Sequence, residues 1–63
     1  MTRGERNNWI VNIENIASFI ESEIGLETVK FVLEKYGASS IEDIPDSALP
    51  DVFGELYAIE VEL

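Results

Sequence analysis

The sequence predicts an all-α protein, a compact three-helix unit with one extra short helical turn. Apolar residues recur at helical spacing in three segments of the 63-residue chain. Glycine or proline lies between these segments, at places where helices commonly end or begin. Alternation of apolar and polar residues with a period of two is confined to residues 59–63, which have no partner run for a sheet. We therefore expect helices over residues 8–24, 27–36 and 50–62, a turn near 40–44, and a single domain over 1–63.

The first predicted helix runs from residue 8 to residue 24. An apolar stripe about 120° wide follows it at ~100° per residue. The stripe contains Trp9, Ile10, Ile13, Ile16, Ala17, Ile20 and Ile24. Asn7 or Asn8 is a suitable N-cap residue. Residues 1–6 contain Gly4 and show no apolar periodicity, so we expect them to be frayed.

Two glycines mark the ends of the first and second helices. Gly25 fits the left-handed position just after a helix, and Gly37 supplies a second stop of the same kind. These positions favour two separate helices over one long helix that is kinked at Gly25. The expected buried stripe of the second helix consists of Val29, Val32, Leu33 and Tyr36.

The segment after Gly37 carries two competing signals. Ser39 and Glu42 have the spacing of a capping box, whereas Pro45 disfavours helical geometry at the preceding residue. A single helical turn that points Ile41 and Ile44 into the core satisfies both signals.

Proline also marks the start of the last helix. Pro50 has the φ angle of a first helical position, and Asp51 behind it suits the positive end of the helix dipole. The expected apolar face consists of Leu49, Val52, Phe53, Leu56, Ile59 and Leu63.

The composition excludes several classes of function. The chain has no His and no Cys, and its 13 acids against four bases give a net charge of −9. Disulfides and ordinary zinc, haem or iron–sulfur sites would lack their ligands. No apolar run exceeds four residues, too few for a membrane span or the apolar core of a signal peptide. We expect a cytoplasmic protein that binds neither membranes nor, because of its charge, nucleic acid directly.

The acidic residues predict neither an active site nor a metal site. Thirteen acids form close pairs by chance, and 63 residues leave little material for a cleft between two catalytic carboxylates. Asp43, Asp46 and Asp51 surround a loop, but their spacing differs from that of a calcium-binding loop. We therefore expect no enzyme, no cofactor and no metal, and interpret these acids as solvated residues near helix starts.

Four apolar residues fall outside the predicted buried stripes: Val11, Phe19, Phe31 and Val61. Single exposed apolar residues are common, but two phenylalanines on adjacent helices are not. Phe19 and Phe31 either line a second flank of the core that the third helix covers, or form a patch that pairs with another copy or another protein. The second alternative predicts a non-enzymatic, self-associating protein–protein interaction module, a homo-oligomer.

Acids on the last helix suggest a different function. Asp51, Glu55 and Glu62 project within about 40° of one another. The first two are about 6 Å apart along the axis, close to the distance between neighbouring phosphates of a nucleic-acid strand. Such a stripe either mimics nucleic acid and inhibits a host protein with a basic surface, or keeps a small protein soluble.

Glu60 differs from these acids because it lies on the apolar face of the last helix. It either reaches solvent at the end of the chain, pairs with a base such as Lys35 or Arg6, or contacts a basic residue of a partner.

Residues 27–44, followed by residues 49–60, resemble small acidic orphan proteins of phages and conjugative elements in Gram-positive bacteria. Some such accessory proteins inhibit host defence nucleases. The resemblance therefore adds weight to the nucleic-acid mimic, but it transfers no binding residue to this chain.

Overall fold

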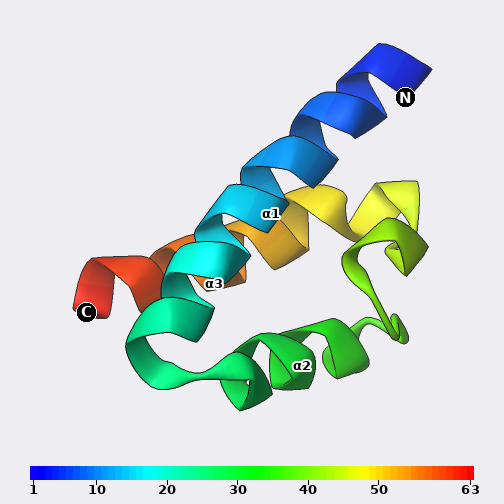
Figure 1. Ribbon diagram of the computed structural model, residues 1–63. Helices are drawn as coiled ribbons and strands as arrows, with labels where there is room; N and C mark the ends of the chain where they lie inside the picture. Colours follow the sequence, from blue (N-terminus) through cyan, green and yellow to red (C-terminus); the bar gives the residue numbers. More distant parts are fainter.

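Three α-helices and two short 3-10 helices make up the chain in the computed structural model, which describes residues 1–63 (Figure 1). The elements are α1 (Arg3–Ile24), α2 (Leu26–Lys35), η1 (Ile41–Asp43), η2 (Asp46–Ala48) and α3 (Leu49–Glu62). α1 and α3 run in the same direction, and α2, which lies between them in the sequence, runs in the opposite direction (Figure 1). The predicted all-α three-helix unit is confirmed. None of the helices has the length and apolar content that crossing a membrane requires.

The N-terminal residues are helical, so the prediction that residues 1–6 are frayed is wrong. α1 begins at Arg3 after a capping box. Thr2 Oγ1 accepts a hydrogen bond from the Glu5 N–H, and the Glu5 carboxylate accepts one from the Thr2 N–H, each 3.1 Å long. These bonds satisfy backbone donors at the start of the helix. Asn7 and Asn8, the predicted caps, therefore lie inside the first two turns.

Gly25 separates α1 from α2, which confirms two helices rather than one kinked helix. Its φ of 106° and ψ of 166° lie outside the left-handed helical region that we predicted. This combination is essentially restricted to glycine. Gly37 has the predicted left-handed φ, 74°. The Ala38 N–H donates to the Leu33 carbonyl and the Gly37 N–H to the Glu34 carbonyl, the two bonds of a Schellman motif.

The connection between α2 and α3 contains the predicted turn and one that we did not predict. η1 places Ile44 in the core and Ile41 at its edge. The predicted Ser39–Glu42 capping box is absent, because the Asp43 carboxylate accepts the hydrogen bonds of the Ser39 N–H and O–H instead. The additional turn, η2, forms where the Ala48 N–H donates to the Pro45 carbonyl.

Arg6 joins the start of α1 to this connection. Its Nη1 donates to the Ile44 carbonyl at 2.8 Å and to Asp46 Oδ1 at 2.7 Å, and its Nη2 donates to the Glu42 carbonyl at 2.8 Å. These bonds span 36 to 40 residues of sequence. They explain why the first turns of α1 are held against the rest of the molecule.

The core is formed by apolar residues of all three α-helices and the connection. Its buried members are Ile13, Ile16, Ala17, Ile20, Val29, Val32, Leu33, Ala38, Ile44, Ala48, Leu49, Val52 and Leu56. The predicted stripes are thus confirmed along most of their length. Ile24 and Leu63, which we placed in the core, are each about half exposed. Both stand at the end of a helix, where the packed stripe stops.

Candidate functional site

A row of aromatic side chains follows the line where α1 meets α3. The Trp9 ring meets the Phe53 ring edge-on, with centroids 5.7 Å apart, and the Phe53 ring stacks on the Tyr57 ring at 6.2 Å. Both arrangements are favourable for aromatic pairs. The row runs from the partly buried Trp9 to Tyr57, which is 53% exposed. An aromatic surface therefore continues outward from the core along α3.

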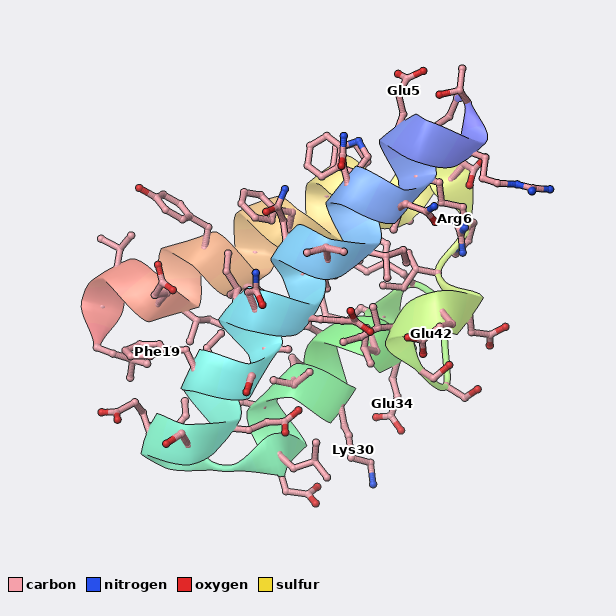
Figure 2. All side chains as sticks on the ribbon, turned by 45° about the horizontal axis from the view of Figure 1, so that its top comes forward. Glu5, Arg6, Phe19, Lys30, Glu34 and Glu42 are labelled. Atoms are coloured by element: carbon pink, nitrogen blue, oxygen red, sulfur yellow. The ribbon has the colours of Figure 1, made fainter.

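This row lies on the side of the α1–α3 pair that is opposite α2. On α3, the Glu55 carboxylate reaches the other way and accepts hydrogen bonds from Lys35 Nζ and the Tyr36 hydroxyl at the end of α2. On α1, Arg6 likewise reaches the connection that follows α2. Phe19 projects to the α3 side of α1, whereas Arg6, Glu42 and Lys30 lie on the other side (Figure 2).

We define the α1–α3 face as the outward side chains that flank this row. On α1 they are Asn8, Asn12, Asn15 and Phe19, and on α3 they are Phe53, Tyr57, Glu60 and Val61. Glu60 is partly buried and projects close to Phe53 on α3. Glu5 and Glu23 project on the same side of α1, near the two ends of the face. The face therefore combines apolar and amide side chains with a few carboxylates.

The four apolar residues that the sequence singled out are all exposed. Their exposed fractions are 52% for Val11, 45% for Phe19, 64% for Phe31 and 65% for Val61. The alternative in which the third helix covers Phe19 and Phe31 is wrong. Phe19 and Val61 belong to the α1–α3 face, whereas Val11 projects away from the buried stripe of α1. Sequence reasoning missed Tyr57 as their neighbour, although Phe53, Tyr57 and Val61 are spaced four residues apart and so share one side of a helix.

Phe31 is separated from the other three, on the outer side of α2. Val29, Val32 and Leu33 of this helix are buried, and Phe31 projects away from them. Lys35 Nζ lies 5.7 Å from the centre of its ring. The shallow depression of about 470 Å³ beside it is otherwise lined by Glu27, Thr28, Lys30 and Glu34. Phe31 thus has charged neighbours and does not extend the α1–α3 face.

The predicted acidic stripe is interrupted at Glu55. The hydrogen bonds that Glu55 accepts from Lys35 and Tyr36 lower the pKa of Glu55. The bond between Tyr36 and Glu55 also raises the pKa of Tyr36 to about 12. Asp51 and Glu62 are exposed, but Glu55 is partly buried and already paired. The middle member of the stripe therefore stabilises the α2–α3 contact.

Glu60 has neither of the ion-pair partners that we considered, because Lys35 pairs with Glu55 and Arg6 with Asp46. The Glu60 side chain is partly buried on α3. A contact between Glu60 and a base of another molecule stays a prediction.

Two carboxyl groups meet between α1 and η1. A hydrogen bond to Glu42, with desolvation and charge repulsion, raises the pKa of Glu14. No group of three or more Asp and Glu side chains is arranged to hold a metal ion.

No protein-family model matches the chain, and neither the curated proteins nor the solved structures gave a significant match. The resemblance to small acidic proteins of phages and conjugative elements stays a prediction.

Proposed function

We propose that this chain is a non-enzymatic protein–protein interaction module that self-associates. The observation that carries the proposal is the α1–α3 face, where Phe19, Tyr57 and Val61 are each about half exposed or more. A contiguous apolar surface is typical of a binding site for another protein. A domain of ~60 residues buries only about 60% of the surface of its unfolded chain. A second chain on this face would therefore add to the stability of the first.

Two observations favour a protein partner over a small-molecule substrate. The two depressions on the surface are open to solvent and lie along α2 and the residues just after it, and both include Lys30 and Glu34. Glu55 and Asp46, which carry two of the 13 acids, already bind Lys35 and Arg6. Neither the surface depressions nor these two ion pairs form an enclosed cavity that holds an unpaired acid beside an unpaired base.

The nucleic-acid mimic has less support. With Glu55 paired to Lys35, the exposed acids of the stripe are Asp51 and Glu62. They are about 16 Å apart along the helix axis, more than twice the spacing of neighbouring phosphates. A basic nucleic-acid channel would find no continuous row of charges on α3.

Sedimentation equilibrium over a range of protein concentrations tests the proposal. We expect the mean mass of the unaltered chain to rise with concentration, and Phe19→Glu and Val61→Glu to reduce this rise. Phe31→Glu is the matched control, because it introduces the same charge at a more exposed phenylalanine on the outer side of α2. Added salt should leave the association intact, since it screens the repulsion between chains of charge −9.

Two results would contradict this function. One is a chain that stays monomeric up to millimolar concentration. The other is a strongly salt-sensitive complex with a basic protein that is lost in a double variant, Asp51→Asn with Glu62→Gln, because this result would favour the mimic.

A further inference from the structure

A single residue, Gly25, separates α1 from α2. Every other residue from Arg3 to Lys35 is helical. At Gly25, a φ of 106° and a ψ of 166° turn the chain back, so that α2 folds against the core side of α1 (Figure 1). We call this arrangement the closed chain. Its packing depends on the backbone conformation of one glycine.

The helix ends on the two sides of Gly25 carry backbone groups that are complementary to each other. No side chain caps the start of α2, and the Gly25 N–H, which donates to the Glu21 carbonyl, makes the last backbone hydrogen bond of α1. The carbonyls of residues 22–24 and the N–H groups of residues 26–28 make no hydrogen bond within the chain. In an α-helix each N–H donates to the carbonyl four residues earlier. These three donors and three acceptors would therefore pair if Gly25 became helical.

A continuous helix over α1 and α2 could not fold against its own core. The buried residues of the two helices are Ile13, Ile16, Ala17 and Ile20 on α1 and Val29, Val32 and Leu33 on α2. At ~100° per residue, the centres of these two stripes would lie about 160° apart around one straight helix. The stripe of α2 would then point away from the side on which α1 packs against α3. A chain that opens at Gly25 therefore exposes apolar residues that only another molecule can cover.

A second copy of the chain matches these exposed residues, because it carries the segment that has moved away. In the closed chain, α1 is held by its apolar stripe, by the contact between the rings of Trp9 and Phe53, and by the hydrogen bonds of Arg6 to the connection after α2. All of these contacts join residues on opposite sides of Gly25. The α1 helix of another copy can make every one of them, so no new complementary surface is required.

We propose that Gly25 is a hinge, and that two copies of this chain exchange their α1 helices when α1 and α2 join into one continuous helix over residues 3–35. In the exchanged dimer, α1 of each copy packs against α2 and α3 of the other, in the place that α1 occupies in the closed chain. The exchange goes beyond the proposed function, because it requires no contact through the α1–α3 face.

Substitutions at the hinge test the exchange by sedimentation. Gly25→Ala should lower the Kd of the dimer at least about a hundredfold, because alanine disfavours a positive φ and favours a helix, and both chains of the dimer benefit. Gly54→Ala is the matched control, since its Cβ also meets no atom within 4 Å but its backbone is already helical, and it should leave this Kd unchanged. Two glycines inserted after Gly25 should abolish the exchanged dimer, because they interrupt the continuous helix.

A distance within one chain distinguishes the exchanged dimer from any dimer of closed chains. Asn7→Cys and Glu34→Cys place two spin labels on exposed residues of α1 and α2, in a chain that has no other Cys. The continuous helix would hold these positions about 40 Å apart, whereas the whole closed chain is 32 Å long. Pulsed electron spin resonance measures this distance after refolding from urea at millimolar concentration. An excess of unlabelled chain ensures that each dimer contains at most one labelled copy.

The labels are measured both with Gly25 and with Gly25→Ala, so the test does not depend on the folding of the variant. The long distance in the chain with Gly25, and a larger share of it in Gly25→Ala, supports the exchange. Its absence from the chain with Gly25 overturns the exchange, even if Gly25→Ala shows it, because glycine would then keep the hinge closed. A dimer that keeps the short distance and is weakened by Phe19→Glu supports the proposed function and overturns the exchange. A dimer with the long distance that Phe19→Glu leaves intact supports the exchange and contradicts association through the α1–α3 face.

Discussion

Replacing Gly25 with alanine perturbs the fold at the point where α1 turns into α2. Gly25 has a φ of 106° and a ψ of 166°, which side chains of L-residues rarely adopt. An added Cβ would meet no atom within 4 Å, so contact with neighbouring residues contributes nothing to the effect. The cost is therefore that of the backbone conformation alone, of order 1–3 kcal/mol.

This cost is large for so small a protein. At ~0.05–0.15 kcal/mol per residue, the free energy of unfolding is roughly 3–9 kcal/mol. Gly54→Ala is the matched control, because its Cβ also enters open space but its backbone is helical. Alanine is favoured over glycine inside a helix, so we expect this control to gain about 0.5–1 kcal/mol.

Urea unfolding followed by circular dichroism measures both variants. With an m value of about 1 kcal/mol/M, Gly25→Ala should lower the midpoint by roughly 1–3 M, and Gly54→Ala should raise it. The protein has to be dilute, because self-association would add to the apparent stability. An unchanged midpoint for Gly25→Ala would refute the reasoning, since it would mean that the turn does not require a positive φ.

Three further substitutions test individual contacts. Glu55→Gln should lower the pKa of Tyr36 from about 12 toward its ordinary value of 10.0, because the carboxylate that accepts the hydrogen bond of the phenol is gone. Ultraviolet absorbance measures this pKa in a chain whose second tyrosine, Tyr57, is replaced by phenylalanine. An unchanged pKa of Tyr36 would argue against the bond. In the unaltered chain, the stability from Tyr36 is present below pH 10 and is lost as the pH rises toward about 12. Arg6→Ala should cost about 1–3 kcal/mol in urea unfolding through its three lost hydrogen bonds; Arg3→Ala, at an exposed arginine without such bonds, should cost little, and equal losses would contradict this account. The raised pKa of Glu14 contributes stability at low pH that is lost as the pH rises through this pKa, so Glu14→Gln should stabilise the chain more at pH 7 than at pH 4; a melting-temperature gain independent of pH would exclude this coupling.

The sequence by itself determined the helices and most of their ends. The apolar stripe of α1 and the stops at Gly25 and Gly37 depend on residues a few positions apart, and local spacing is enough to recognise them. The start of α1 could also have been predicted from the sequence, because Thr2 and Glu5 have the capping-box spacing. Our prediction for residues 1–6 rested on their missing periodicity and on Gly4, and did not take this spacing into account.

The tertiary structure alone decided which apolar residues stay uncovered. Phe19 and Phe31 have the same side chain and both lie outside a buried stripe, yet Phe19 belongs to the α1–α3 face and Phe31 lies among charged neighbours on the outer side of α2. It likewise decided that Glu55 binds Lys35 and Tyr36, 20 and 19 residues earlier in the chain. Helical periodicity gives the direction of a side chain relative to its own helix axis. What that side chain meets depends on how the helices pack, and this packing is set by contacts between residues far apart in the sequence.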